Sequence, residues 1–336
     1  MAALHQVIIN KKTNINPIWI MRQAGRYLPE FREIRKENQN FIELCLNSSL
    51  SSEITLQPIK RFNIDSAIIF SDILLVPYAL GQKVDFIQNQ GPLLSNFNSK
   101  FFFSISEQDF IKQLKPVYNS ISMTREKLQK EKSLISFVGA PWTLLIYMFN
   151  LKTKEGKINF TKIKEKESLS KEILDKLIKF LCVHIEKQIE AGADTVQIFD
   201  SWAGLLPEEY LKSFCFSPNL KITEFCKSKK IPIICFPKGI NKNYKKFADF
   251  VKPDGISLDY EIDPIWAKQN LTNVVLQGGL NPKILLESDD IIYAEAKKYL
   301  DIFKDVPYIF NLGHGLVPET DPNKLGKLID FVRKYK

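Results

Sequence analysis

The chain has 336 residues with 45% hydrophobic and 25% charged side chains, proportions that suit a globular protein with a sizeable core. Its formal net charge of +9 could serve a nucleic-acid partner, but the lysines are spread along the chain and no basic block with interleaved aromatic residues occurs. Composition and charge therefore give no support to nucleic-acid binding, although a basic surface would also suit an anionic small molecule.

The sequence gives no indication of a membrane or secreted protein either. The N-terminal segment lacks the apolar core and the small-residue cleavage site of a signal peptide. The longest apolar stretch, residues 66–80, is interrupted by Ser71, Asp72 and Pro77 and is too short to span a bilayer. The five cysteines include no C-x-x-C pair, which is typical of reduced thiols. We therefore expect a cytoplasmic protein with no membrane partner.

Short apolar runs rich in β-branched residues recur along the chain and predict eight strands. These runs span 17–21, 66–70, 133–138, 195–199, 231–236, 255–259, 273–277 and 307–311. Amphipathic stretches, such as 171–192, are long enough for helices and separate several of the runs. The alternation predicts a parallel sheet, and eight strands favour a closed β/α barrel over a doubly wound open sheet, since no G-x-G-x-x-G follows the first run.

The first predicted strand leads into "MRQAGRYLPEFREIR" (21–35), which holds four of the seven arginines of the chain. An arginine fork grips a carboxylate or a phosphate with two hydrogen bonds, which lysine cannot do. We interpret Arg22, Arg26 and Arg35 as an anion clamp at the barrel mouth. The alternative is that Arg32 and Arg35 form weak surface pairs with nearby glutamates on a helix, which is the favoured interpretation for Arg32.

Polar residues also follow most of the later strands, and active sites of β/α barrels are built at these C-terminal strand ends. The residues concerned are Ser71, Asp72, Tyr147, Asp200, Ser201, Asp259 and His314. Asp72 lies in an apolar segment, so it either pairs with an arginine or accepts hydrogen bonds from a ligand. His314 lies between two glycines, which favours a functional role. Tyr147 could instead be a core residue, and Ser201 could only cap a helix.

Several of these segments carry a family resemblance. "PIWIMRQAGRYLPEFREIR" (17–35) resembles the N-terminal signature of uroporphyrinogen decarboxylases, and "FVGAPWTLLIYM" (137–148) resembles their second signature. Residues 67–81, 197–204 and 310–322 are similar to further family segments in the expected order. The resemblance runs from about residue 17 to the C-terminus.

The resemblance implies a single distorted (β/α)8 TIM barrel over residues 1–336, with 1–16 as an N-terminal tail, and a homodimer. The implied activity removes CO2 from the four acetate side chains of uroporphyrinogen III and gives coproporphyrinogen III, with no metal and no organic cofactor. Arg22, Arg26 and Arg35 match the active-site arginines, and Asp72 matches the aspartate that accepts hydrogen bonds from the pyrrole N–H groups. Tyr147, Ser201 and His314 match the remaining polar contacts, and the backbone around Gln23, Ala24 and Gly25 lies in the same substrate-binding loop.

The chemistry of such a reaction needs a proton donor and a stabiliser of positive charge. Protonation of a pyrrole carbon creates an electron sink, and a fixed carboxylate beside the N–H groups stabilises the cation, a role that we assign to Asp72. The donor is left open between Arg22, Arg35, Tyr147, His314 and a water.

Two alternative functions are compatible with this fold or with the arginine clamp. A zinc- or corrinoid-dependent methyltransferase needs a thiolate–imidazole metal site, but Cys182 and His184 diverge on their predicted helix. A non-catalytic tetrapyrrole carrier would not need Asp72.

His184 and His5 are interpreted as structural. Gly279 and Asn281 depart from the family pattern, 152–168 is expected to be a solvated loop, and 85–106 is expected to cover the mouth or a dimer contact.

Overall fold

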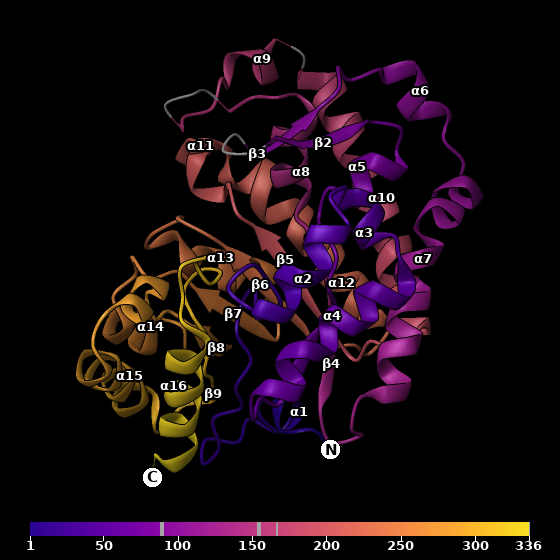
Figure 1. Ribbon diagram of the computed structural model, residues 1–336. Coiled ribbons are helices and arrows are strands. Elements are labelled where there is room, and N and C mark those ends of the chain that lie inside the picture. The colour runs from indigo at the N-terminus through magenta and orange to yellow at the C-terminus, as the bar shows by residue number, and fades with distance from the viewer. Residues whose placement is uncertain (88–90, 153–155, 166, 336) are drawn as a thin grey trace.

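The computed structural model describes residues 1–87, 91–152, 156–165 and 167–335. Within these residues one sheet contains seven parallel strands in the order β1-β4-β5-β6-β7-β8-β9 (Figure 1). The strands are β1 (Ser66–Ile68), β4 (Ser133–Gly139), β5 (Thr195–Asp200), β6 (Ile233–Pro237), β7 (Gly255–Leu258), β8 (Val275–Gly278) and β9 (Tyr308–Ile309). Each lies within or beside a run that the sequence predicted as a strand.

The eighth predicted strand, residues 17–21, closes the sheet without forming a full ladder. Ile18 makes a single parallel bridge to Phe310, whose N–H donates to the Pro17 carbonyl at 2.9 Å. On the other side the Asp65 N–H donates to the Ile18 carbonyl at 2.8 Å. The Asp65 carboxylate also accepts the Ile18 N–H at 2.6 Å, so a side chain occupies a donor that a strand would use. The segment thus joins both edges of the sheet, and the predicted distorted barrel is confirmed.

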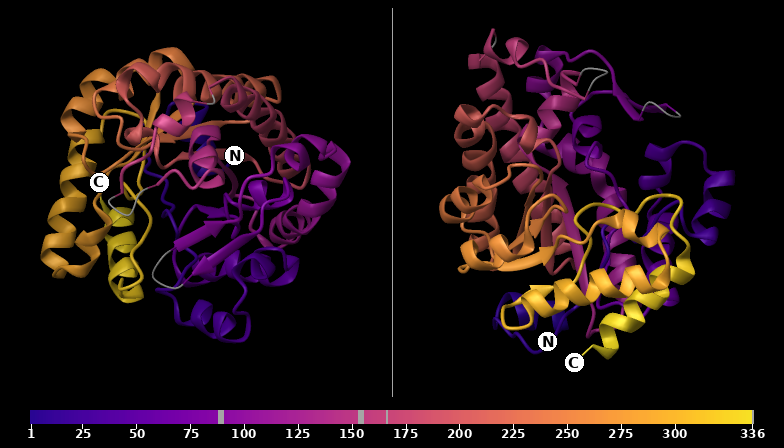
Figure 2. Two further views of the ribbon diagram at one scale, coloured as in Figure 1. Left: turned by 90° about the horizontal axis from the view of Figure 1, so that it is seen from above. Right: turned by 90° about the vertical axis from the view of Figure 1, so that its left-hand side faces the viewer.

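Helices surround the strands, as the view from above shows (Figure 2). The helices from the N-terminal half are α1 (Ala3–Ile8), α2 (Pro29–Glu37), α3 (Phe41–Cys45), α4 (Ser48–Arg61), α5 (Leu75–Ala79), α6 (Ser99–Ser104), α7 (Glu107–Lys127), α8 (Pro141–Met148) and α9 (Thr161–Lys164). Those that follow are α10 (Glu167–Glu190), α11 (Glu208–Tyr210), α12 (Ser217–Ser228), α13 (Asn243–Val251), α14 (Pro264–Asn270), α15 (Asp289–Phe303) and α16 (Pro322–Lys334). Short 3-10 turns cover Ala203–Leu205 and Pro282–Leu286, and a π turn covers Leu211–Phe216.

Helix α10 shows why the amphipathic stretch 171–192 folds as predicted. Its buried residues, among them Ile173, Leu177, Leu181 and Ile185, recur at intervals of four on one face. Gly192 follows the helix with φ +112°, a conformation that L side chains rarely adopt and that ends the helix. The apolar face can therefore pack against the sheet while lysines and glutamates face solvent.

The barrel interior holds its own apolar cluster, which includes Trp19, Ile68, Ile135 and Ile234. Residues of α1 belong to the same cluster, because Leu4, Val7 and Ile8 are buried against it. The segment 1–16, expected as a tail, therefore contains a helix that packs on the lower end of the barrel. His5 in this helix lies 3.0 Å from both the Asp194 carbonyl and the Thr195 hydroxyl, in keeping with a structural role.

The upper end of the molecule in Figure 1 carries the segments that leave the barrel. Within 85–106, strands β2 (Val84–Ile87) and β3 (Gly91–Leu94) form an antiparallel hairpin that is followed by α6. The expectation of a solvated loop at 152–168 is wrong for its described centre. The Phe160 ring packs on the Tyr210 ring at 4.3 Å and Ile163 is buried, because these two apolar residues anchor a lysine-rich segment. Residues 153–155 and 166 lie outside the described residues.

The described helices were compared with the length and hydropathy of membrane-spanning helices. In the described ranges none of them has both the length and the apolar character that a bilayer crossing requires.

Candidate active site

The arginine loop begins at a strained residue. Arg22 has φ +63°, a left-handed conformation that costs energy for a side chain other than glycine. Such strain is kept where the surroundings fix it, and it is most common at functional sites. The fixing contacts come from Gln23, whose N–H donates to the Ile20 carbonyl at 2.8 Å and whose Oε1 accepts the Ile20 N–H at 3.0 Å.

The side chain and the backbone carbonyl of Gln23 both form hydrogen bonds within the protein. Its side chain is buried, and its Nε2 donates to the Ser66 carbonyl at 3.1 Å in β1. Its backbone carbonyl accepts the Tyr27 hydroxyl at 2.7 Å. The buried Gln23 side chain therefore supports the loop, while Ala24 and Gly25 are half-buried beside it.

The Arg22 side chain lies over the turn that follows β9. A Cβ atom built on Gly315 would lie 2.3 Å from Arg22 Cδ and 2.7 Å from its Nε. The Leu316 N–H donates to the Met21 carbonyl at 3.0 Å, which holds the two segments together. Glycine at 315 therefore leaves the room that the Arg22 side chain needs.

Arg26 and Arg35 lie near each other at the same mouth. Arg35 is half-buried, contacts the Phe41 ring at 5.6 Å and donates to the Asn38 and Gln39 carbonyls. Burial and, less strongly, the Arg26 charge lower the pKa of Arg35. None of the four arginines between 22 and 35 forms an ion pair within the described residues, so the clamp has uncompensated charge.

Arg32 belongs to the loop structure, not to the mouth. Its guanidinium donates to the Arg26 carbonyl at 3.0 Å and to the Tyr27 carbonyl at 2.9 Å. The contacts of Arg32 are therefore structural, but they are made to backbone carbonyls, and the predicted pair with a glutamate is not found among the described residues.

Asp72 lies just after β1, where α5 begins. Its Oδ1 accepts the Leu74 N–H at 2.8 Å, and the side chain is half-buried with no arginine in ion-pair contact. Burial raises the pKa of Asp72 to about 6, although the Leu74 N–H and the Arg22 charge oppose the shift. Of the two interpretations, a structural arginine pair is not formed, and the second carboxylate oxygen is left for a ligand.

Tyr147 lies on α8 and is half-buried. Its ring meets the Trp202 ring edge to face, with centroids 6.1 Å apart. Burial raises the pKa of Tyr147, and the charge of Asp72 adds to this while the Arg22 charge opposes it. The phenol is therefore protonated at neutral pH and lies within the electrostatic reach of both Arg22 and Asp72.

Ser201 and the neighbouring Asp200 have different surroundings. Asp200 is buried and accepts the Thr143 hydroxyl at 2.7 Å and the Asn219 amide at 3.2 Å, so it ties β5 to two helices. Ser201 comes next, is half-buried and lies at the strand end. Asp259 is likewise structural, since its Oδ2 accepts the Gly239 N–H at 2.7 Å and the Tyr244 hydroxyl at 2.9 Å.

His314 is held in the turn after β9 and is half-buried. Its Nδ1 is buried without a hydrogen-bond partner among the described residues. Burial, with smaller contributions from the charges of Lys238 and Arg22, lowers the pKa of His314 to about 4, while Asp259 opposes the shift. The imidazole is therefore neutral at physiological pH, with one ring nitrogen available for a ligand.

Two features of the mouth were missed by the sequence analysis. Phe137, Phe199 and Phe236 form an aromatic floor, with centroids 5.6 Å apart for the first pair and 6.4 Å for the second. They could have been found from the alternation of strand residues, because each lies two positions after an interior residue. The second missed feature is Lys238, which follows β6 directly.

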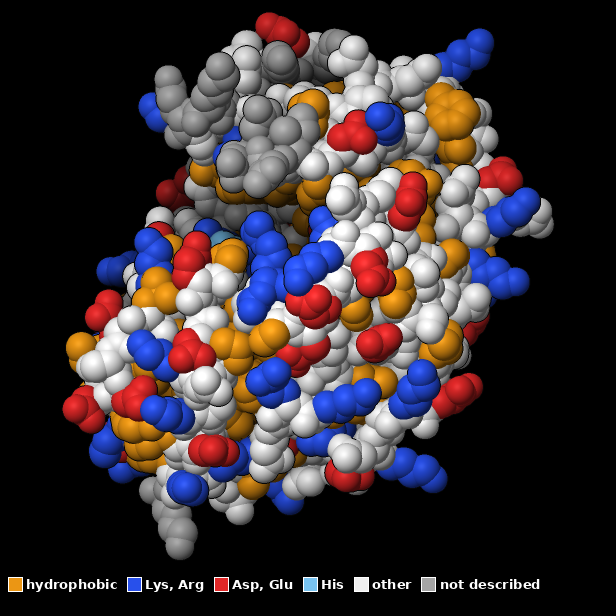
Figure 3. All heavy atoms as spheres, in the orientation of Figure 1, with side chains coloured by type: hydrophobic (Ala, Val, Ile, Leu, Met, Phe, Trp, Pro, Cys, Tyr) orange, Lys and Arg blue, Asp and Glu red, His pale blue; other side chains and the backbone are white. Residues whose placement is uncertain are grey.

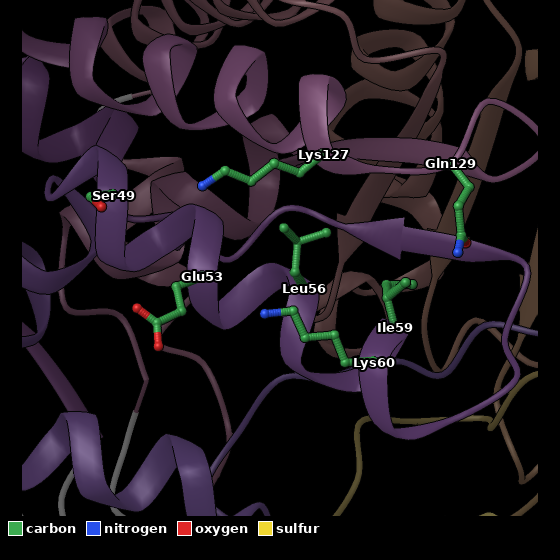
Figure 4. A pocket seen from close by; sticks show the side chains of 7 residues that line it. All are labelled: Ser49, Glu53, Leu56, Ile59, Lys60, Lys127 and Gln129. Carbon is green, nitrogen blue, oxygen red and sulfur yellow. The ribbon is translucent and has the colours of Figure 1, made fainter.

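The site is a basic hollow below the excursion that carries β2 and β3, where lysine and arginine side chains gather around the opening (Figure 3). A separate surface hollow of about 680 Å³ lies between α4 and α7 and contains none of the strand-end residues (Figure 4). It is lined by Ser49, Glu53, Leu56, Ile59, Lys60, Lys127 and Gln129. We place the candidate site at the strand ends because the charged and titratable groups converge there.

The described residues contain no group of three histidine, cysteine or acidic side chains arranged to hold a metal ion. The closest sequence candidate was Cys182 with His184. His184 is buried and its Nδ1 lies 3.1 Å from the Tyr118 hydroxyl, which is in keeping with a structural role.

Comparison with known proteins gives consistent matches. The family model described as uroporphyrinogen decarboxylase (URO-D) matches residues 2–335. A protein named uroporphyrinogen decarboxylase from Rickettsia bellii is 44% identical over 98% of this chain and 97% of its own length. One of the same name from Jannaschia sp. is 38% identical over 95% of both chains.

Solved structures show the same fold in proteins with other names. A methyltransferase from Methanosarcina mazei superposes with a TM-score of 0.80 at 18% identity, covering 98% of this chain and 97% of its own. A B12-independent methionine synthase from Shewanella superposes with a TM-score of 0.51 at 12% identity, covering 95% of both. At these identities the likeness concerns the fold alone.

Proposed function

The chain belongs to the uroporphyrinogen decarboxylase family, and on that premise we propose that its barrel mouth converts uroporphyrinogen III to coproporphyrinogen III. This is a carboxy-lyase reaction of haem and chlorophyll synthesis, which removes CO2 from four acetate side chains. One observation carries the proposal. The Arg22 charge acts on Asp72, Tyr147 and His314 together, so residues from four distant segments meet at one end of the barrel.

The arginine clamp accounts for substrate binding. Uroporphyrinogen carries eight carboxylates around its ring, and Arg22, Arg26 and Arg35 offer guanidinium groups without carboxylate partners of their own among the described residues. We propose that two further groups bind the substrate beside these arginines. They are the backbone N–H groups of Ala24 and Gly25 and the hydroxyl of Ser201. The half-buried rings of Phe137 and Phe199 supply an apolar surface for the pyrrole rings.

Asp72 acts at the centre of the macrocycle. Its carboxylate accepts hydrogen bonds from pyrrole N–H groups and faces the positive charge that develops when a ring carbon is protonated. Each cycle breaks one bond between the acetate methylene and its carboxylate, releases CO2 and leaves the electron pair in the protonated ring. The methylene then takes a proton to become a methyl group, and the ring returns its own proton. The net change replaces CO2 by one proton at each acetate.

The proton donors can be narrowed by their pKa values. With a pKa of about 4, His314 holds no extra proton at neutral pH, so we assign it a hydrogen bond to a substrate carboxylate or N–H group. Tyr147 carries its proton at neutral pH, since its pKa is raised. Arg35 has a lowered pKa, which makes it a better acid than an ordinary arginine. Tyr147, Arg22, Arg35 and a water remain the candidate donors in the proposal.

The deciding experiment is anaerobic incubation with freshly reduced uroporphyrinogen III, with EDTA and without added cofactor. The products are oxidised and separated by carboxylate number. Successive seven-, six-, five- and four-carboxylate species support the decarboxylase and a reaction that the chain's own residues catalyse. Recovery of only the eight-carboxylate material from folded protein contradicts it and leaves the non-catalytic carrier.

We also infer a cytoplasmic homodimer. Four apolar side chains of the excursion are more than a third exposed, namely Phe86, Leu93, Phe101 and Phe103, at 38%, 51%, 49% and 40%. Exposed apolar side chains of this kind occur at protein interfaces. All five cysteines are free thiols, which suits a reducing compartment.

A further inference from the structure

Lys238 occupies a defined position at the end of β6. Ile234 and Phe236 of this strand belong to the apolar cluster inside the barrel. Lys238 follows this strand directly, in a turn where its N–H donates to the Phe236 carbonyl at 3.0 Å. Pro237 pairs with Asp200 in the sheet register, which brings Lys238 beside Ser201 at the mouth.

The backbone around Lys238 is fixed by its neighbours. Its N–H donates to the Asp200 carbonyl at 3.1 Å, and its carbonyl accepts the Gly204 N–H at 2.9 Å. A Cβ atom on Gly204 would lie 2.5 Å from the Gly239 carbonyl oxygen, so the loops after β5 and β6 are in close contact. The direction in which the lysine side chain leaves the backbone is therefore set by the barrel and not by solvent.

The ammonium group of Lys238 has no ionic partner in the described part of the chain. The side chain is half-buried and takes part in none of the ion pairs found there. Asp200 and Asp259, the acidic residues on the adjoining loops, already accept hydrogen bonds from other groups. The charge of Lys238 is felt by His314, which places both groups in one electrostatic environment.

Lys238 also lies across the mouth from the arginine loop. The segment 17–21 joins β1 and β9, and β6 is the fourth strand away from it in either direction around the sheet. A ligand with acidic groups on all sides would leave some of them far from Arg22, Arg26 and Arg35. A half-buried lysine opposite these arginines supplies the missing cation.

We propose that the Lys238 ammonium binds a carboxylate of the substrate on the side of the barrel mouth opposite the arginine loop. The proposal rests on the proposed function and names one further contact of the same site. Because the contact is made to a side chain at the rim of the macrocycle, it acts equally on the bound substrate and on the transition state. It should therefore affect the KM more than the kcat.

The test compares Lys238→Met with Lys242→Met, a change of an exposed lysine on the same loop. With uroporphyrinogen III, Lys238→Met is expected to raise the KM about tenfold, the loss that one charged contact supplies, with the kcat changed by less than about threefold. Lys238→Arg should restore most of the affinity, and Lys242→Met should behave as the wild type. If Lys238→Met matches the wild type in KM, the proposal is overturned.

Binding of oxidised porphyrins separates this proposal from the proposed function. Uroporphyrin III and coproporphyrin III are unreactive here, and their affinities can be measured by fluorescence even if no turnover occurs. A weaker affinity of Lys238→Met for both porphyrins supports a contact to a propionate, and a weaker affinity for uroporphyrin alone supports a contact to an acetate. Unchanged affinity for both contradicts the proposal, whatever the wild-type activity. If Lys238→Met does not fold, Lys238→Gln takes its place under the same criteria.

Discussion

At the scale of single residues, Asp72 differs from an ordinary surface carboxylate. It is half-buried, receives one backbone N–H and has a pKa raised to about 6. A carboxylate kept in a site of low polarity exerts a stronger field on a developing cation than one in water. The burial that supports the catalytic role proposed for Asp72 also makes its charged form unfavourable for folding.

Asp72→Asn should abolish most of the turnover and leave binding in place. The amide keeps the shape and can still accept one hydrogen bond, but it has no charge for the protonated ring. We expect the kcat to fall at least about 100-fold while the affinity for uroporphyrin III changes little. Product analysis and fluorescence titration measure the two effects. Equal turnover in the two proteins would contradict the role of Asp72.

The same variant should alter the dependence of stability on pH. The pKa of Asp72 is raised on folding from about 3.8 to about 6, so the folded state binds the proton more tightly than the unfolded state. This contribution to stability is present below pH 3.8 and is lost as the pH rises through 6. Urea unfolding should therefore show Asp72→Asn gaining stability relative to the wild type between pH 4 and pH 7. A constant difference across that range would contradict the raised pKa.

Gly315→Ala should disable the arginine clamp without unfolding the barrel. The added Cβ would lie 2.3 Å from Arg22 Cδ, so the side chain must move away from its position over the turn. We expect a rise in the KM for uroporphyrinogen and a small change in the melting temperature. Gly326→Ala on α16 is the matched control, since its Cβ would meet only Phe62 at 3.7 Å. That change should leave the activity intact and stabilise the helix by about 0.5–1 kcal/mol.

At the scale of elements, the segment 17–21 and the loop after it hold the barrel closed. Gln23 supplies two of the contacts, one to the Ile20 N–H and one to the Ser66 carbonyl, and both lie in buried surroundings. Sequence patterns identified 17–21 as a strand, but the closure depends on side chains of Asp65 and Gln23 that no strand pattern reveals.

Gln23→Ala should therefore destabilise the whole domain. Two buried backbone groups would lose their partners, which costs roughly 2–4 kcal/mol of unfolding free energy. Urea denaturation measures the change, and Gln113→Ala, an exposed position on α7, serves as the control with little expected effect. A Gln23 variant as stable as the control would show that the loop is held by other contacts.

At the scale of the whole molecule, the exposed apolar side chains of the excursion bear on the proposed dimer. Leu93→Glu places a charge at an exposed apolar position of β3 and should convert the proposed dimer to a monomer. Light scattering after gel filtration gives the mass. Ile291→Glu, an equally exposed apolar position on α15, should leave the mass unchanged. Dimers in both variants would locate the interface elsewhere.

Much of the architecture could be predicted from local patterns. Strand positions follow from short β-branched runs, and the helix at 171–192 follows from residues spaced by three and four, because these periods depend on backbone geometry alone. The clustering of polar residues after the strands followed from the rule that parallel strands present their C-terminal ends at one edge. The prediction of a solvated loop at 152–168 was wrong because a few apolar residues determine how this segment packs. Phe160 and Ile163 anchor a segment that its lysines had marked as a solvated loop.

The sequence by itself determined the barrel class, the family and the residue types available for the site. Only the tertiary structure decided how those residues divide their roles. It assigned Arg32 and the Gln23 side chain to the loop, left Arg22, Arg26 and Arg35 without carboxylate partners among the described residues, and added Lys238 across the mouth. The reason is physical. Local order depends on neighbours within a few positions, whereas burial, charge and free hydrogen-bonding capacity depend on groups brought together from distant parts of the chain.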